Sequence, residues 1–370
     1  MYDVLIIGGG LAGLINAIVL SKAGKKVILI ERKTYPFHRV CGEYISNETL
    51  PFLASLDINP KEWGASAINH LQVSAPNGTL LFMPLDMGGF GISRYTLDYN
   101  LYLKAIQSQV TVITGTSVED VIFSGDIFSI TLSDHTIYKA RFVIGAYGKR
   151  AKLDKQLNRS YIYKRSPYVG VKYHIRTDFP ANYIALHNFK NGYCGLSAVE
   201  GDKYNLCYLT TRENLKKSGS IEEMERNILQ RNPFLHQIFS NSQFLFEKPE
   251  VINEISFAPK TAVENHILMS GDTAGMITPL CGNGMAMAIH SAKLLSGLLL
   301  KSDEEKWSRE RLEVVYTKQW KELFAQRLWV GRNLQKLFGD ERLTAMSVRL
   351  LKTMPSLTKF LISKTHGSVF

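Results

Sequence analysis

The sequence predicts an α/β fold in which a parallel sheet is joined to an antiparallel β-sheet and to a helical C-terminal segment. Residues 2–7 and 26–30 are continuous apolar runs of strand length, as expected for parallel strands covered on both faces. Near the other end, a short apolar strand at 267–269 leads through a glycine-bearing loop into a helix from about 285 to 300. Between these ends, runs such as 168–174 alternate in the manner of an antiparallel sheet.

The composition is that of a globular protein. Hydrophobic residues make up 45% and charged residues 21% of the 370 positions, which excludes a disordered or collagen-like chain. The four cysteines form no C-x-x-C pair, so a zinc ribbon or thioredoxin-type site is not expected and a reducing cytoplasm fits best. The start lacks the basic region of a signal peptide, and glycines interrupt the uncharged run at 4–21. We therefore expect no transmembrane helix.

The net charge of +11 would suit nucleic acid, an anionic membrane or anionic ligands. No zinc-finger spacing, RNP-like strand or base-reading basic helix accompanies it, so we do not expect nucleic-acid binding. From Lys301 onward, 14 basic and 8 acidic residues give a net charge of +6. This segment includes an amphipathic basic stretch at 356–364. Two interpretations stay open: a helical cap on the parallel-sheet unit, or a peripheral contact with a membrane surface.

The turn after the first strand, residues 8–13, reads Gly-Gly-Gly-Leu-Ala-Gly and fits G-x-G-x-x-G. Gly8 permits the tight turn, Gly10 lets a pyrophosphate approach the backbone, and Gly13 lets the helix pack closely on the sheet. The helix N-terminus offers free amides to the phosphates. Glu31 ends the second strand and can accept hydrogen bonds from ribose hydroxyls. Strand, turn, helix and acidic residue together predict an adenine-dinucleotide site.

A second signature lies at 265–285, where a strand runs into Gly271-Asp272 and then a loop containing Pro279. It resembles the second flavin-binding motif of the para-hydroxybenzoate hydroxylase superfamily, whose FAD-binding domain is of the Rossmann-like, glutathione reductase type 2 kind. The resemblance implies that Asp272 binds ribityl or ribose hydroxyls and that the loop lines the flavin ring. It also implies that the helix N-terminus faces the ring edge where negative charge collects. The cofactor is therefore expected to be FAD.

Three further stretches match that superfamily. Arg94 opens a helix that reaches about residue 107, and the resemblance places it near the FAD phosphates. Val118 sits where the family's backbone contacts adenine. Gly148 ends a Gly-x-x-Gly turn in which Tyr147 replaces the Asp of many members, a motif linked to both FAD and NADPH. This departure argues against the hydroxylase-type use of NADPH.

The segment 39–46, with Cys41-Gly42 inside it, closely resembles the Cys-Gly segment of geranylgeranyl reductase-like flavoproteins, which lies near the flavin ring on the substrate side. The stretch 364–367 also resembles that branch. Cys41 is the candidate catalytic residue, as a thiol that tunes the flavin or protonates a substrate carbanion; the alternative is a small structural filler. Glu43 and Tyr44 are alternative proton donors. The branch's longer aromatic motif is largely absent at 191–196, so isoprenoid substrates do not transfer directly.

Because the two signatures lie at opposite ends of the chain, we expect a discontinuous FAD-binding domain. It comprises residues 1–63, 92–150 and 260–300, the substrate domain comprises 64–91 and 151–259, and the C-terminal helical segment comprises 301–370. No metal site is expected. The candidate FAD-binding residues are Gly8, Gly10, Leu11, Ala12, Gly13, Glu31, Arg32, Arg39, Arg94, Val118, Gly148, Asp272, Pro279, Gly282, Asn283, Gly284 and Met285.

The expected function is that of an FAD-dependent oxidoreductase acting on a lipophilic small molecule, such as a polyketide-derived aromatic, a quinone precursor or an isoprenoid. Hydroxylation and C=C reduction both stay open, as does the oligomeric state. With no second G-x-G-x-x-G in the sequence, NAD(P)H as reductant would bind only transiently. The alternative is an electron-transfer flavoprotein that docks on a membrane quinone. We expect a cytoplasmic protein, and membrane association through the basic C-terminus stays open.

Overall fold

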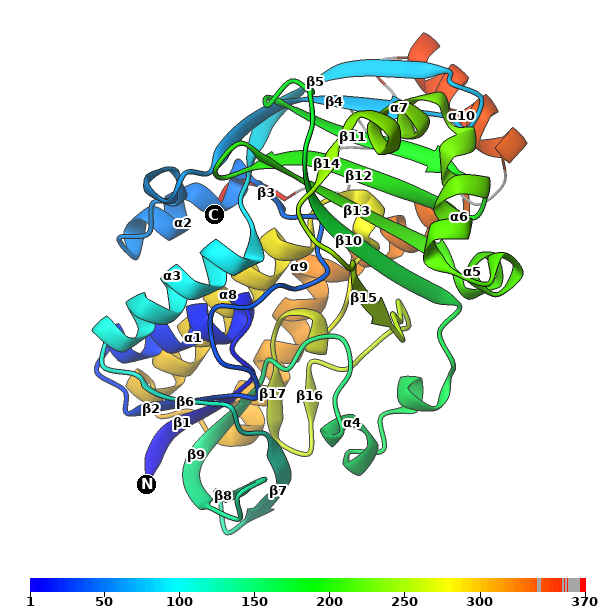
Figure 1. Cartoon of the computed structure of the whole chain (residues 1–370). Coiled ribbons are helices and arrows are strands. Elements are labelled where there is room, and N and C mark those ends of the chain that lie inside the picture. Colours follow the sequence, from blue (N-terminus) through cyan, green and yellow to red (C-terminus); the bar gives the residue numbers. More distant parts are fainter. Residues whose placement is uncertain (338–340, 355, 357, 359–366) are drawn as a thin grey trace.

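Two sheets stacked along the molecule define the architecture of the computed structural model (Figure 1). The structure describes residues 1–337, 341–354, 356, 358 and 367–370. The first sheet lies with the N-terminus at the bottom of Figure 1, and the second sheet forms the top. Long helices run from the first sheet towards the second. The α/β fold expected from the sequence is confirmed.

The first sheet has the strand order β16-β17-β9-β1-β2-β6, with β7 and β8 as an antiparallel excursion from β9. From β17 to β6 every neighbouring pair is parallel. The strands are β1 (Tyr2–Ile7), β2 (Val27–Glu31), β6 (Thr111–Thr114), β7 (Val118–Ser124), β8 (Ile127–Leu132), β9 (Ile137–Gly145), β16 (Val263–Glu264) and β17 (Ile267–Met269).

The first helix explains why its sequence is apolar on nearly all sides. It follows β1, packs on the sheet, and lies between α3 and α8 (Figure 1). Even Asn16 is fully buried, and its amide donates to the Ala12 carbonyl at 2.7 Å. The α-helices are α1 (Leu11–Lys22), α2 (Leu50–Ser55), α3 (Arg94–Gln107), α4 (Leu153–Gln156), α5 (Arg212–Ser218), α6 (Ile221–Asn227), α7 (Pro233–Asn241), α8 (Gly284–Glu304), α9 (Arg309–Leu337) and α10 (Glu341–Thr353).

The second sheet has the order β14-β10-β13-β12-β11-β4-β5-β3, with β15 also paired to β10. Its pairs are antiparallel except β4 and β11, which are parallel, so the expected antiparallel sheet contains one parallel step. One face packs apolar side chains against α6 and α7, and the other face looks towards the first sheet's layer. The strands are β3 (Tyr44–Ser46), β4 (Ser66–Ser74), β5 (Leu80–Gly91), β10 (Tyr168–Arg176), β11 (Tyr183–Phe189), β12 (Gly192–Val199), β13 (Lys203–Thr211), β14 (Gln243–Phe244) and β15 (Glu250–Asn253).

One detail differs from the sequence-based picture. β3 lies inside the segment 1–63 expected for the FAD domain, yet it pairs with β5 of the second sheet. The chain therefore crosses between the layers directly after Cys41, and the domain boundaries stay a prediction.

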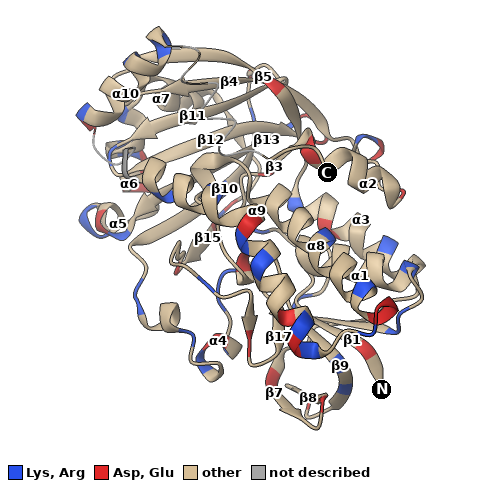
Figure 2. Ribbon diagram, turned by 180° about the vertical axis from the view of Figure 1, so that it is seen from behind, with Lys and Arg blue, Asp and Glu red and all other residues tan. Residues whose placement is uncertain are grey.

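The C-terminal segment is helical over its described residues. In α9 an apolar stripe packs on the core of the first sheet; its buried members are Leu312, Tyr316, Trp320, Phe324 and Leu328. The ribbon in Figure 2 shows basic residues, in blue, along α9 and on α10. Most of the amphipathic basic stretch at 356–364, and 364–366 of the family-like stretch, lie outside the described residues. Within the described part of the chain, no helix is both long and apolar enough to span a membrane.

Candidate FAD and substrate site

The glycine turn has the geometry that a bound diphosphate requires. Gly8 has φ +103°, and a Cβ there would lie 2.5 Å from the Ala146 carbonyl oxygen. A Cβ on Gly13 would lie 1.9 Å from the Gly8 carbonyl oxygen, so helix α1 approaches the turn at backbone distance. Gly10 caps α1 without any side-chain hydrogen bond to its first amides from the described residues. The first turn, with Leu11 and Ala12, therefore presents unpaired N–H groups to an anion.

Acidic and basic side chains surround this turn. The buried Glu31 carboxylate accepts from the Gly9 amide at 2.8 Å, and Arg39 lies 3.3 Å from it. Arg39 also reaches Asp98 at 2.9 Å. Glu31 thus sits at the end of β2 directly against the glycine turn, where ribose hydroxyls of a dinucleotide would meet its remaining lone pairs.

Arg94 lies over the same turn. A Cβ on Gly10 would be 3.6 Å from its guanidinium nitrogen, so nothing bulkier separates the two. Asp98, one helical turn further on, holds the guanidinium through two bonds of 2.7 and 2.8 Å. Asp98 is nearly fully buried and fixes both Arg39 and Arg94, a role that the sequence analysis missed. The sequence feature that could have indicated this role is the spacing of Arg94 and Asp98, which are four residues apart on one helix.

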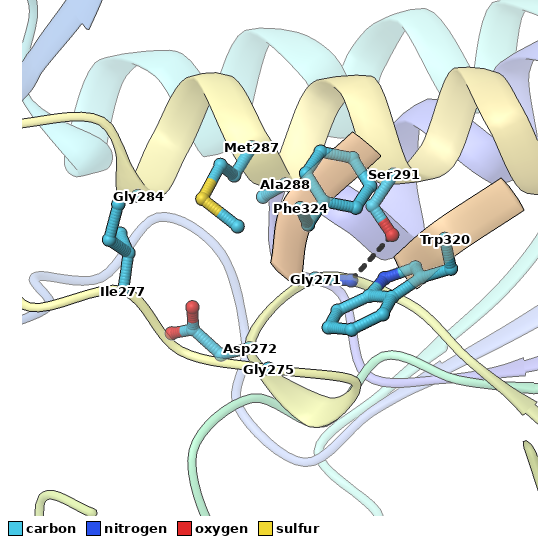
Figure 3. Close-up of a pocket in the computed structure, with 10 residues that line it drawn as sticks. All are labelled: Gly271, Asp272, Gly275, Ile277, Gly284, Met287, Ala288, Ser291, Trp320 and Phe324. Carbon is cyan, nitrogen blue, oxygen red and sulfur yellow. Dashed lines mark hydrogen bonds between the residues drawn. The ribbon is translucent and has the colours of Figure 1, made fainter. Parts of the chain in front are cut away.

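The Asp272 loop forms a small pocket with α8 and α9 (Figure 3). The Gly271 amide donates to Ser291 Oγ of α8 at 3.1 Å, which ties the loop to the helix. The Asp272 carboxylate turns towards the side of the loop that carries Ile277 and Gly284 (Figure 3). Burial raises the pKa of Asp272, a cost that hydroxyl donors of a ligand would offset.

Lys260 lies behind this loop and binds two backbone carbonyls, those of Lys149 at 2.9 Å and Asp272 at 2.8 Å. Burial lowers the pKa of Lys149 to about 8 and that of Lys260 to about 8. Gly148 joins the same region because its amide donates to Thr273 Oγ1 at 2.9 Å. Two turns far apart in the sequence are thereby locked together.

The N-terminus of α8 carries a clear sign of a missing polar partner. Asn283 is fully buried at the cap position, and neither its side-chain nitrogen nor its oxygen has a hydrogen-bond partner among the described residues. The Asn283 amide lies near enough to the Glu48 carboxylate to offset part of the rise that burial causes in its pKa, although the two make no hydrogen bond of standard geometry. Unpaired buried amides cost free energy, so this end of α8 is built for a polar ligand. Gly284 and Met285 form the first turn of the same helix.

These features fit FAD. The free first turn of α1, the buried Glu31 and Arg94 suit the adenosine diphosphate half, while Asp272 and the orphaned Asn283 suit the ribityl–flavin half. Gly282, at φ +63°, lets its loop approach Tyr44, with 3.5 Å between a Cβ there and the Tyr44 ring. Three further predicted FAD-binding residues lie near these elements. Arg32 is exposed directly after β2, and Pro279 is exposed on the Asp272 loop. Val118 is the first residue of β7, which follows β6, the strand whose last residue pairs with Glu31.

Cys41 lies between the two layers, in a segment of residues 39–43 that we call the strap. Asn205 of β13 donates to the Cys41 carbonyl at 3.1 Å, and Ser197 of β12 donates to the Gly42 carbonyl at 3.3 Å. Arg94 approaches the Cys41 thiol from the glycine-turn side. Burial raises the pKa of Cys41, which keeps the thiol protonated at neutral pH.

The strap ends on a buried ionic cluster that the sequence did not reveal. Glu43 is fully buried and accepts from Lys172 Nζ at 2.5 Å, and His174 Nε2 lies 2.7 Å from its other oxygen. The only sequence signal was that Lys172 and His174 alternate with apolar residues along β10, which suggests a face turned to solvent. The structure covers that face with the strap.

Tyr147, which replaces the Asp of many family members, binds a buried carboxylate. Its hydroxyl donates to the buried Asp154 carboxylate at 3.1 Å, and burial raises the pKa of Tyr147 well above its usual range. Asp154 in turn pairs with Arg159 at 3.1 Å. Among the residues that the structure describes, no group of three or more His, Cys, Asp or Glu side chains is arranged to hold a metal ion.

Two known proteins resemble this chain over most of its length. A digeranylgeranylglycerophospholipid reductase of Methanosarcina acetivorans is 26% identical over 345 residues, covering 87% of this chain and 81% of that protein. Conditioned medium factor receptor 1 of Dictyostelium discoideum is 22% identical over 83% of this chain, which spans 64% of the receptor's length.

Two solved structures share the fold at 18% sequence identity. The crystal structure of P. aeruginosa PqsL in complex with 2-aminobenzoylacetate has a TM-score of 0.77 and covers 94% of this chain and 99% of that one. The halogenase PltM has a TM-score of 0.79 and covers 98% and 82%. Residues 1–326 match the protein family described as FAD binding domain. The chain therefore belongs to the FAD binding domain family and is an FAD-dependent oxidoreductase.

Proposed function

We propose that this protein reduces a C=C bond of a lipophilic substrate and that Cys41 supplies the proton. The observation that carries the proposal is the position of the thiol. Burial keeps it protonated, Arg94 approaches it from the side of the glycine turn, and Asn205 of the second sheet binds its backbone carbonyl. A neutral acid at that point is what protonation of a carbon next to an incoming hydride needs.

The neighbouring candidates suit this role less well. Burial raises the pKa of the Glu43 carboxyl, but Lys172 and His174 outweigh it and lower the pKa overall, so Glu43 is ionised at neutral pH. The Tyr44 hydroxyl donates to the Gly88 carbonyl at 3.4 Å, and burial raises its pKa beyond that of an ordinary phenol. Cys41 thus remains the acid whose proton is available.

Each binding residue has a definite task in this scheme. FAD, when bound, supplies the redox chemistry by taking up two electrons and passing them on with a proton as hydride. The first turn of α1 and Arg94 would hold its phosphates, and Glu31 and Asp272 would hold its ribose and ribityl hydroxyls. The N-terminus of α8 would place positive potential and Asn283 at the ring's polar edge.

A lipophilic substrate fits the inner face of the second sheet. Tyr193, Leu209 and Ile255 form a buried apolar cluster there, and Met276 and Leu280 of the Asp272 loop pack against it. The loop expected at the flavin and the sheet therefore meet across apolar side chains. The named activity of the Methanosarcina relatives, reduction of a digeranylgeranylglycerophospholipid, is consistent with such a surface.

We also propose that helix α10 touches an anionic membrane surface from which a lipid substrate would be drawn. Met346, Leu350 and Met354 follow one another at a spacing of four residues and are 68%, 52% and 47% exposed. Arg349 and Lys352 flank them and are exposed. The Met346→Ser/Leu350→Ser variant should sediment less with vesicles containing anionic lipid, whereas neutral vesicles should bind neither protein. Equal sedimentation of both proteins would contradict this contact.

The reductant is proposed to be NAD(P)H, bound transiently. Basic side chains are frequent between 149 and 165, next to the Asp272 loop, and Lys155, Lys164 and Arg165 are exposed there. They would attract a phosphate-bearing donor.

The test of the Cys41 role uses Cys41→Ala with Cys194→Ala as the matched control, since Cys194 is buried on the opposite face of β12. Reduced wild-type protein in D₂O should place deuterium on the product carbon that Cys41 protonates. Cys194→Ala should retain this activity, and Cys41→Ala should lose at least tenfold in rate while it keeps FAD. Full activity of Cys41→Ala would refute the assignment.

A further inference from the structure

The ionic cluster beneath the strap is buried, and its carboxylate is bonded on both oxygens. Glu43 uses both carboxylate oxygens: one accepts from Lys172 Nζ at 2.5 Å and from the Arg94 amide at 2.7 Å, and the other faces His174 Nε2 at 2.7 Å. Glu43 and Lys172 have no measurable solvent exposure. Proteins in which apolar side chains of similar volume replace a buried ion pair are often at least as stable as the original. Stability alone therefore does not account for the pair of Glu43 and Lys172.

The cluster also fixes the backbone around Cys41. Glu43 has φ +53°, in the left-handed region that a non-glycine residue adopts only when its surroundings enforce it. Lys172 Nζ donates to the Arg39 carbonyl at 3.2 Å, while Asn205 and Ser197 donate to the carbonyls of Cys41 and Gly42. Three strands of the second sheet thus hold successive parts of the strap through side chains.

Charge around the Cys41 thiol comes from the same groups. Burial is the main influence that raises the pKa of Cys41; the Glu43 carboxylate raises it further, and the guanidinium of Arg94 and the ammonium of Lys172 lower it. Other titratable groups face the cluster from every neighbouring element: His38 and Arg39 of the strap region, His174 of β10, Lys203 and Cys207 of β13. Among the charged groups, Arg94 acts most strongly on the thiol, Glu43 opposes it, and Lys172 acts more weakly in the same direction as Arg94.

We propose that Glu43 and Lys172 are positioning residues for Cys41: they fix the strap in its left-handed turn and balance the charge around the thiol so that it stays a neutral proton donor. This inference rests on the proposed function, because it explains how the donor is kept in its active form. It assigns a task to a buried ion pair that touches neither of the two FAD signatures.

The test measures the protonation of Cys41 directly, without catalysis. The rate of Cys41 alkylation by iodoacetamide is followed against pH in the holoprotein, with each cysteine resolved by peptide mass spectrometry. Because only the thiolate reacts, a change of one unit in the thiol's pKa changes the rate about tenfold at a pH well below the pKa. Glu43→Gln should raise the Cys41 rate about tenfold near pH 8, and Lys172→Gln should lower it by a similar factor.

The opposite signs separate this role from a merely structural one. If the pair only props up the strap, either change loosens it and both variants react faster. The double variant Glu43→Gln/Lys172→Gln should return towards the wild-type rate, and Glu43→Asp, which keeps the charge, should stay close to it. Faster alkylation in Lys172→Gln, or no change in either single variant, would overturn the proposal. If Glu43→Gln does not fold, the result for Lys172→Gln alone decides.

The proposed function fails separately from this inference. If Cys41→Ala reduces substrate at the wild-type rate, Cys41 is not the donor, whatever the alkylation rates show. If Cys41→Ala is inactive but the two charge variants leave the alkylation profile unchanged, Cys41 is the donor and the positioning role is wrong.

Discussion

Replacing Gly13 by Ala gives the most quantitative test of the dinucleotide turn. In an exposed helix this change would stabilise the protein by about 0.5–1 kcal/mol, because Ala loses less backbone entropy than Gly. In this helix the new Cβ would lie 1.9 Å from the Gly8 carbonyl oxygen, and real Cβ contacts stay above 3.0 Å. The helix and the turn must then separate by roughly 1 Å, and overpacking of this kind costs about 1–3 kcal/mol.

The expected net effect is therefore a loss of about 1–2 kcal/mol in the free energy of unfolding, together with at least tenfold weaker FAD binding. Gly297→Ala is the matched control, since Gly297 lies in α8 with nothing within 4 Å of its Cβ position. It should gain about 0.5–1 kcal/mol and keep FAD. Urea unfolding of the apoprotein and flavin absorbance of the purified protein measure both quantities. A Gly13→Ala protein that is yellow and no less stable than wild type would refute the close approach.

Two further predictions concern buried polar groups. Burial lowers the pKa of His187 to about 3, so between pH 6.5 and 3 the unfolded state binds the extra proton and stability falls; from pH 7 to 5 the fall is about 2 kcal/mol. His187→Gln should flatten urea-unfolding stability over that range, while exposed His135→Gln should not; identical slopes would contradict the burial argument. Tyr147→Asp places a second carboxylate beside the buried Asp154 and should lower the free energy of unfolding by about 3–5 kcal/mol. The control Tyr147→Phe, which loses only the hydrogen bond, should lower it by about 1 kcal/mol. Thermal unfolding measures both, and equal losses in the two variants would argue against charge repulsion.

The parts of the structure that could be predicted are those whose chemistry is local. The turn containing Gly8, Gly10 and Gly13 needs only a strand before it and a helix after it, and all three are contiguous in the sequence. The helix that starts at Arg94 ends at residue 107 as expected, because its capping serine and its apolar face are both visible in the sequence.

The ionic cluster could not be predicted in the same way. Glu43 and Lys172 are 129 positions apart and meet only because the chain crosses from one layer to the other after the strap. Along β10, Val169 and Val171 alternate with Gly170 and Lys172, which is typical of a strand with one face in water. Both faces are covered, one by α6 and α7 and the other by the strap, and only tertiary structure reveals this.

The most direct test of the central claim is the mass of the product. Wild-type protein carrying FAD is reduced chemically under strict exclusion of air and incubated with a lipid whose chains contain isolated C=C bonds. The account predicts a product heavier by two hydrogens, formed equally well without oxygen. A product that gains one oxygen atom, and forms only when air is admitted, would contradict it and identify the protein as a monooxygenase.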